Sequence, residues 1–120
     1  TKLIFTNASC RHAEAVTERL GIRNHFDGIF DIHDAAYIPK PAPEIYDQFI
    51  KAFGITPKHT VLFEDTADNL APAAARGMTT VLVRPGEVGV ENDSSADHIH
   101  HVTDNLANWL NSLAPDTGSE

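Results

Sequence analysis

The chain has 120 residues, the length of one ordinary domain, and its 42% hydrophobic and 22% charged residues are typical of a folded globular protein. Nine Lys and Arg against seventeen Asp and Glu give a net charge of −8, which disfavours a nucleic-acid partner because phosphate backbones need clustered cations. The single cysteine, Cys10, excludes an internal disulfide, and there is no run of about 18 apolar residues that would predict a transmembrane helix. We therefore expect a cytoplasmic protein without a membrane partner.

The first half of the chain predicts a strand, a helix, a second strand and a second helix. Residues 2–5 are a short apolar strand that ends in a polar loop. Residues 10–20 carry Ala13, Val16 and Leu20 on one face, the spacing of a helix with an apolar side. Residues 29–32 predict the second strand. After a proline-rich loop, Pro43 suits the first turn of a helix that ends at Gly54.

The second half repeats the alternation. Residues 60–63 and 79–83 are apolar runs typical of buried parallel strands, and a helix between them runs to about Arg76. Residues 98–101 predict a short edge strand, and residues 104–113 predict a final helix. The segment 85–96 reads as a loop, and residues 114–120 as a disordered tail. Strands alternating with helices predict an α/β fold with a parallel sheet, whose ligands bind at the carboxyl ends of the strands.

Polar side chains gather in the loops that follow the first three predicted strands. A hydroxyl and an amide follow the first strand, a lysine between prolines follows the second, and two adjacent acids with a nearby asparagine follow the third. These residues are Thr6, Asn7, Lys40, Glu64, Asp65 and Asn69. Carboxylates hold Mg²⁺, lysine neutralises phosphate charge, and hydroxyl and backbone N–H groups hold phosphate oxygens. Their order on successive strands therefore predicts a metal-assisted phosphoryl-transfer site.

Each of these residues alone also has an ordinary structural explanation. Thr6 suits a polar strand end, and Lys40 suits a solvated loop. The adjacent acids Glu64 and Asp65 are more informative, because two carboxylates at one sheet edge repel each other unless a cation compensates. The prediction of a phosphoryl-transfer site therefore depends on the combination of these residues, not on any one of them.

The same residues resemble the motifs of the haloacid dehalogenase (HAD) superfamily of phosphohydrolases. The segment Ile4–Asn7 resembles the second motif, whose Thr or Ser binds phosphate. Lys40–Pro43 resembles the third, whose Lys contacts phosphate and nucleophile, and Phe63–Asn69 resembles the fourth, whose acids hold Mg²⁺. The sequences of residues 26–31, 37–41 and 77–83 are most similar to the bacterial pyrimidine 5′-nucleotidase-like branch.

This resemblance implies a Rossmann-like HAD core and roles for individual residues. Thr6 and Lys40 would be catalytic and phosphate-binding, and the Asn7 amide would hold a further phosphate oxygen. Asp65 would bind Mg²⁺ directly and Glu64 through water. Asn69 would contact these ligands rather than the metal.

The implied activity is Mg²⁺-dependent hydrolysis of a small phosphorylated metabolite. The ester would be attacked through an aspartyl-phosphate intermediate, and the branch implies a pyrimidine nucleoside 5′-monophosphate as substrate.

The chain departs from the family at its first motif. HAD enzymes attack phosphate with the first Asp of an Asp-x-Asp-x-Thr motif, which this sequence lacks, together with the helical cap that follows it. In the family the strand of that motif lies between those matching residues 2–5 and 60–63. We therefore expect residues 1–113 to form an incomplete core, inactive alone, that a missing N-terminal segment or a second chain completes. The alternative is a non-catalytic α/β module that binds phosphate or Mg²⁺.

Overall fold

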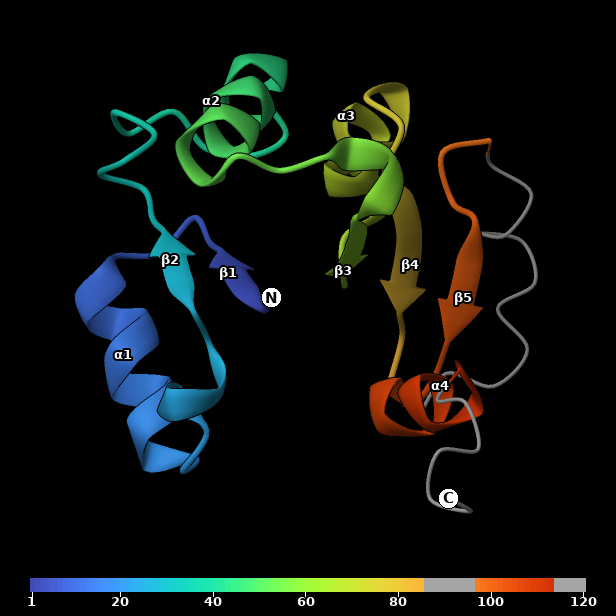
Figure 1. Cartoon of the computed structure of the whole chain (residues 1–120), viewed down its shortest axis with the longest axis horizontal. Helices are drawn as coiled ribbons and strands as arrows, with labels where there is room; N and C mark the ends of the chain where they lie inside the picture. The colour runs from blue at the N-terminus through green and yellow to red at the C-terminus, as the bar shows by residue number, and fades with distance from the viewer. Residues whose placement is uncertain (86–96, 114–120) are drawn as a thin grey trace. The chain divides into compact units, whose positions relative to one another are not determined.

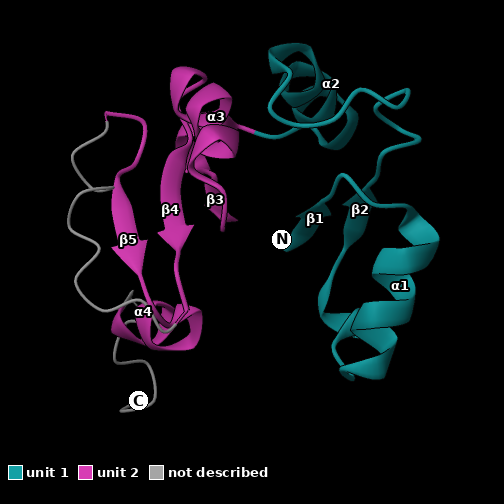
Figure 2. Ribbon diagram, turned by 180° about the vertical axis from the view of Figure 1, so that it is seen from behind, with its two compact units in different colours: residues 1–55 teal, residues 56–120 magenta. Residues whose placement is uncertain are grey.

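The computed structural model describes residues 1–85 and 97–113, in which short strands alternate with helices. All strand pairs within these residues are parallel, which confirms the predicted α/β class. The chain divides into two compact units, Thr1–Ile55 and Thr56–Glu120 (Figure 2), and each is described by itself. The predicted loop at 85–96, apart from Pro85, and the predicted tail at 114–120 lie outside the described residues.

Unit 1 contains two parallel strands with a helix between them in the chain (Figure 1). β1 (Leu3–Phe5) pairs with β2 (Gly28–Phe30). α1 (Cys10–Arg19) and a short 3₁₀ helix, η1 (Arg23–His25), connect them, and α2 (Pro43–Phe53) follows. Because the strands are parallel, their carboxyl ends lie at one edge of the sheet, where such folds bind ligands.

Aromatic side chains from both strands and from α2 form the core of unit 1. The ring of Phe5 stacks on Phe49 with 4.5 Å between the centroids, and it meets Phe30 and Tyr46 edge to face. Tyr46 is fully buried. Such pairs contribute roughly 0.5–1.5 kcal/mol each beyond the burial of their surface. Phe5 lies at the end of β1, so the core reaches the edge of the sheet that carries the predicted site.

Both ends of α2 follow the sequence signals. Pro43 occupies the first turn, where its missing N–H costs nothing, and Gly54 ends the helix in the left-handed region with φ of 62°. The last turn also approaches β2 closely, because a Cβ built on Gly28 would lie 2.6 Å from Cε1 of Phe53. Glycine at this position lets the Phe53 ring pack on the strand.

The face that α1 buries differs from the predicted one. Val16 and Leu20 are 43% and 66% exposed, whereas Thr17 is buried. The Thr17 hydroxyl can be buried because it donates a hydrogen bond of 2.8 Å to the Ala13 carbonyl. The spacing shows that these apolar residues share one face of the helix. It does not show whether other described residues bury that face.

Unit 2 has a parallel sheet in the order β3–β4–β5, flanked in the chain by helices. Its elements are η2 (Pro57–His59), β3 (Val61–Glu64), η3 (Ala67–Leu70), α3 (Ala71–Ala75), β4 (Thr79–Val83), β5 (His101–Thr103) and α4 (Leu106–Leu113). The central strand β4 is buried at Thr80, Val81 and Leu82. Leu82 packs in a cluster with Leu70 and Ile99.

The edge strand of this sheet begins at His101 rather than at the predicted residue 98. The preceding residues contact β4 through both the backbone and the side chain of Thr80. The Thr80 hydroxyl donates to the His98 carbonyl at 2.6 Å, and the backbone N–H of Thr80 donates to Nδ1 of His100 at 3.0 Å. A buried hydroxyl that needs a partner therefore moves the start of the strand.

None of the helices in residues 1–85 and 97–113 is both long enough and apolar enough to cross a bilayer.

Candidate active site

The loop after β1 carries the predicted phosphate-binding hydroxyl. The backbone N–H of Thr6 donates to the Phe30 carbonyl at 3.0 Å, which continues the contact between the two strands past the end of β1. Its Oγ1 accepts the N–H of Ala8 at 3.0 Å, so the side chain closes a tight turn. A hydroxyl that accepts one bond still has its own proton to donate, which is what a phosphate oxygen requires.

Asn7 and Lys40 join the loops that follow β1 and β2. The Lys40 backbone N–H donates to Oδ1 of Asn7 at 2.8 Å, and Nδ2 of Asn7 lies 3.5 Å from the Lys40 carbonyl oxygen. The Asn7 side chain therefore holds the backbone of Lys40 beside the turn that contains Thr6. The structure brings together three residues that the sequence placed in the loops after two separate strands.

The ammonium group of Lys40 reaches back to the carboxyl end of β1. Its Nζ donates to the Phe5 carbonyl at 2.8 Å and lies 4.8 Å from the centroid of the Phe5 ring. A lysine ammonium has three donors, and the contact with Phe5 fixes its position through one of them. The aromatic face adds an electrostatic attraction of roughly 0.5–1 kcal/mol at a partly exposed site. A positive charge is thus held next to the Thr6 turn.

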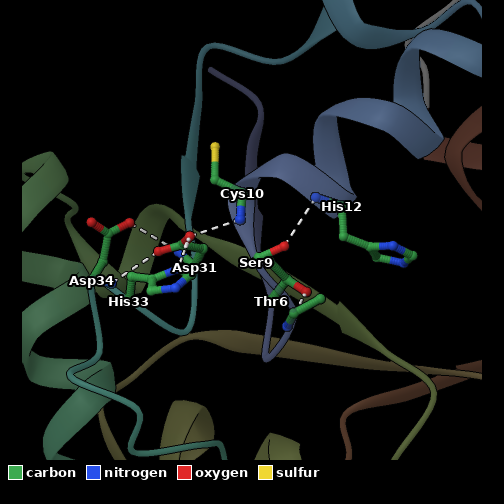
Figure 3. Close-up of polar contacts among 8 residues, drawn as sticks. Thr6, Ser9, Cys10, His12, Asp31, His33 and Asp34 are labelled. Atoms are coloured by element: carbon green, nitrogen blue, oxygen red, sulfur yellow. Dashed lines mark hydrogen bonds and ion pairs between the residues drawn. The ribbon is translucent and has the colours of Figure 1, made fainter.

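Asp31, directly after β2, belongs to the same group of loops but was not among the predicted site residues (Figure 3). Its carboxylate is buried and accepts bonds from the backbone N–H groups of Cys10 and Asp34 and from Nδ1 of His33. Burial alone would raise the pKa of Asp31. The hydrogen bonds from Asp34, His33 and Cys10 outweigh it and hold the pKa well below its ordinary value. The available sequence signal was an acid within the strand predicted at residues 29–32.

The first turn of α1 follows the turn that contains Thr6. Oγ of Ser9 accepts the N–H of His12 at 3.1 Å, a regular N-cap. Partial burial, and then the nearby Glu14 carboxylate, raise the pKa of the Cys10 thiol. A thiol of raised pKa is a poor nucleophile, so Cys10 serves this site through its backbone.

The predicted metal ligands lie in unit 2, where β3 ends. Glu64 is the last residue of β3, and one of its carboxylate oxygens accepts the N–H of Asp65 at 3.2 Å. The exposed Asp65 accepts the Thr66 hydroxyl at 3.3 Å, and the N–H of Asn69 donates to the Thr66 carbonyl at 3.1 Å. One continuous turn therefore carries both acids and the asparagine.

This pair of carboxylates suits Mg²⁺ as a partial ligand set. Mg²⁺ is commonly held by one or two carboxylates, with waters and substrate phosphates filling the other positions. In the part of the chain that the structure describes, no group of three or more His, Cys, Asp or Glu side chains is assembled for a metal. Glu64 and Asp65 therefore fit a metal that also binds the substrate or ligands outside these residues.

The predicted site residues form two groups. In unit 1 the structure assembles Thr6, Asn7 and Lys40, and it adds Asp31. In unit 2 it assembles Glu64, Asp65 and Asn69.

Two phosphatases and a dehalogenase are among the known proteins to which this chain is similar. The chain is 33% identical over 81 residues, 68% of its length, to the fructose-1-phosphate phosphatase YqaB of Escherichia coli K12, and it covers 43% of that protein. It is 41% identical over 63 residues, 52% of its length, to enolase-phosphatase E1 of Frankia alni and covers 26% of that protein. A crystal structure of a dehalogenase with an intermediate complex superposes with a TM-score of 0.78 at 22% identity. This match covers 94% of the present chain and 49% of the dehalogenase chain.

The dehalogenase shares the fold, and the chain spans half or less of the length of each of these three relatives. Residues 2–77, more than half of the chain, match the family model for haloacid dehalogenase-like hydrolases. The chain belongs to the haloacid dehalogenase-like hydrolase family.

Proposed function

We propose that this chain supplies the phosphate-binding and metal-binding parts of a Mg²⁺-dependent phosphate-monoester hydrolase. The observation that carries the proposal is the joined pair of loops at the carboxyl ends of β1 and β2. There Asn7 fixes the backbone of Lys40, and Lys40 places its ammonium on the Phe5 carbonyl beside the Thr6 hydroxyl. Two relatives named as phosphatases support the same chemistry.

The residues of unit 1 would hold the phosphoryl group and compensate its charge. The Thr6 hydroxyl and the backbone N–H of Asn7 would donate to phosphate oxygens, and Lys40 would neutralise charge that develops as the ester bond breaks. Donors that are already fixed in the resting protein do not have to reorganise during the reaction. The contacts of Lys40 with Phe5 and Asn7 give it this kind of preorganisation.

The residues of unit 2 would hold the metal. Asp65 would bind Mg²⁺ directly, Glu64 would bind through water, and Asn69 would orient these carboxylates from the same turn. When bound, Mg²⁺ polarises phosphoryl oxygens and orients the transferred group. The negative charge of the adjacent acids is the property of the chain that favours a divalent cation here.

We place the nucleophile outside these 120 residues, because they contain no Asp-x-Asp-x-Thr segment. An aspartate oxygen from an additional segment would attack phosphorus, and the ester oxygen would leave with a proton from a second acid. Water would then hydrolyse the acyl phosphate. Among the described residues, β1 pairs with β2 alone and β3 with β4 alone, so each has a side on which such a segment can add a strand.

Pyrimidine nucleoside 5′-monophosphates are the substrates we propose. The likeness of residues 26–31, 37–41 and 77–83 to the pyrimidine 5′-nucleotidase-like branch supports this choice. The two named relatives act on other phosphorylated metabolites, so fructose 1-phosphate is the informative comparison substrate.

Phosphate release tests the proposal directly. The 120-residue chain and the protein that carries it together with its completing segment would each be incubated with UMP, CMP and fructose 1-phosphate, with Mg²⁺ or with EDTA. We expect release only by the completed protein, only with Mg²⁺, and faster with the nucleotides. Release by the 120 residues alone would contradict our placement of the nucleophile. A completed protein that binds phosphate without turnover would instead support a non-catalytic binding module.

A further inference from the structure

We infer that Asp31 is a positioning residue for the phosphate loop, defined here as residues 6–10. From the end of β2, its carboxylate holds the point where this loop becomes α1 and so keeps the loop backbone in its phosphate-binding arrangement. The inference rests on the proposed function, since it assigns a role within the same site.

The burial of Asp31 is the first observation. Only 4% of this residue is exposed, and no other acidic residue is buried in the part of the chain that the structure describes. Transfer of a carboxylate out of water is costly unless hydrogen bonds replace its hydration. A buried acid at the edge of a small sheet therefore needs hydrogen-bond donors that stabilise its ionised form.

The partners of Asp31 satisfy both carboxylate oxygens (Figure 3). Oδ2 accepts the N–H of Cys10 at 2.7 Å and lies 3.0 Å from Nδ1 of His33. Oδ1 accepts the N–H of Asp34 at 2.9 Å. Because a carboxylate only accepts hydrogen bonds, His33 is the donor in its pair. Two backbone donors and one side-chain donor thus converge on one negative charge.

The contact with Cys10 is directed at the start of α1. The first N–H groups of a helix have no partner within the helix, and a negative charge there is favoured by the helix dipole. Ser9 satisfies the N–H of His12, whereas Asp31 satisfies the N–H of Cys10. The two caps act on different donors, so Ser9 does not replace Asp31.

Consecutive residues at the end of β2 hold alternate residues of the phosphate loop. The Phe30 carbonyl accepts the N–H of Thr6 at 3.0 Å, and the Ile32 N–H donates to the Ala8 carbonyl at 3.0 Å. Between them, Asp31 holds Cys10. Of these three contacts only the one from Asp31 is made by a side chain, so it is the contact that a substitution can remove while the backbone pairing stays.

The test is the affinity of the chain for inorganic phosphate, followed in ¹H–¹⁵N NMR spectra through the backbone amides of the phosphate loop. Asp31→Asn keeps the size of the side chain, but its NH₂ group must face one of the converging donors. We expect the Kd for phosphate to rise about tenfold, a moderate value for a displaced binding group. The matched control is Asp27→Asn, which removes a carboxylate bonded to the Lys2 N–H at the other end of β2. It should leave the Kd unchanged.

Unfolding curves and a third variant separate the possible outcomes. A purely structural role for Asp31 would lower the melting temperature and leave the Kd of the folded protein unchanged, which would overturn the inference. Thr6→Val tests the proposed function by itself. If Thr6→Val weakens phosphate binding and Asp31→Asn does not, the positioning role alone is wrong. If neither variant changes the Kd, the proposed phosphate site is wrong.

If Asp31→Asn does not fold, His33→Ala provides the same test more gently. His33 is exposed, and its loss removes one donor from Oδ2 while the backbone donors remain. We expect a rise in Kd of about two- to threefold, as for loss of one hydrogen bond of modest net value. Unchanged affinity, with unchanged loop amide shifts, would overturn the inference.

Discussion

Replacing Lys40 by methionine tests the central claim about the site. The substitution keeps an unbranched side chain. It removes the ammonium, together with its bond of 2.8 Å to the Phe5 carbonyl. The loss is therefore mainly one of charge at a defined point.

The expected magnitude follows from the position of the ammonium. A unit charge about 4 Å from a phosphate charge is worth roughly 4 kcal/mol at the effective dielectric constant of about 20 that applies near a protein surface. Lys40 is only half-buried, so solvent screening reduces this value. We expect kcat of the completed enzyme to fall about 10²- to 10³-fold, the usual effect of removing one fixed group that stabilises developing charge.

Steady-state kinetics with UMP at saturating Mg²⁺ measure this effect. Lys51→Met is the control, because it removes the same charge from an exposed position on α2, and it should leave kcat unchanged. Lys40→Arg should restore little activity, since a planar guanidinium does not reproduce the point contact with Phe5. Equal losses in the Lys40 and Lys51 variants, or a change in KM alone, would refute the reasoning.

Three further predictions concern the metal, the packing and the pH dependence. Asp65→Asn should abolish Mg²⁺-dependent turnover of the completed enzyme while Asp68→Asn does not, and equal Mg²⁺ titrations for the two would remove Asp65 from the metal site. Gly28→Ala should destabilise the chain by about 1–3 kcal/mol in thermal unfolding, because its Cβ would lie 2.6 Å from the Phe53 ring, and Phe53→Leu should recover part of the loss. Because the folded pKa of Asp31 is lowered, its contribution to stability should be present above about pH 4 and lost as the pH falls further. Urea unfolding of wild type and Asp31→Asn should then converge in acid, and a constant difference between them would contradict the lowered pKa.

The sequence predicted most of the fold because local signals agreed with the final elements. The apolar run at 79–83 became β4 with the predicted bounds, and Pro43 and Gly54 mark the ends of α2. The α/β alternation gave the parallel pairing. These features depend on periodicity, turn chemistry and backbone geometry, which neighbouring residues determine by themselves.

The departures arise where a residue forms hydrogen bonds with a partner far away in the chain. The strand predicted at 98–101 begins later because Thr80 bonds to the residues before it. The strand predicted at 29–32 ends at Phe30 because Asp31 and Ile32 bond to the phosphate loop. No local pattern contains these partners, so the positions of such contacts could not be read from the residues alone.

The candidate site shows the same division. The residue types and their order predicted one site from Thr6, Asn7, Lys40, Glu64, Asp65 and Asn69. Within unit 1, the structure joins Asn7 to Lys40 by hydrogen bonds, directly after Thr6. The part played by Asp31 depends on the approach of the α1 start to the end of β2, which only the folded chain shows.

The Phe5 ring links the site to the core in a way that constrains how this protein can vary. Phe5 packs in the core of unit 1, where its ring contacts Phe30, Tyr46 and Phe49. The same ring lies beside the ammonium group of Lys40. A change in the shape of the core is thereby transmitted to the position of the cation. Redesigning the aromatic interior of this unit for greater stability would therefore also move the cation of the proposed phosphate site, so stability and the proposed site cannot be optimised independently at Phe5.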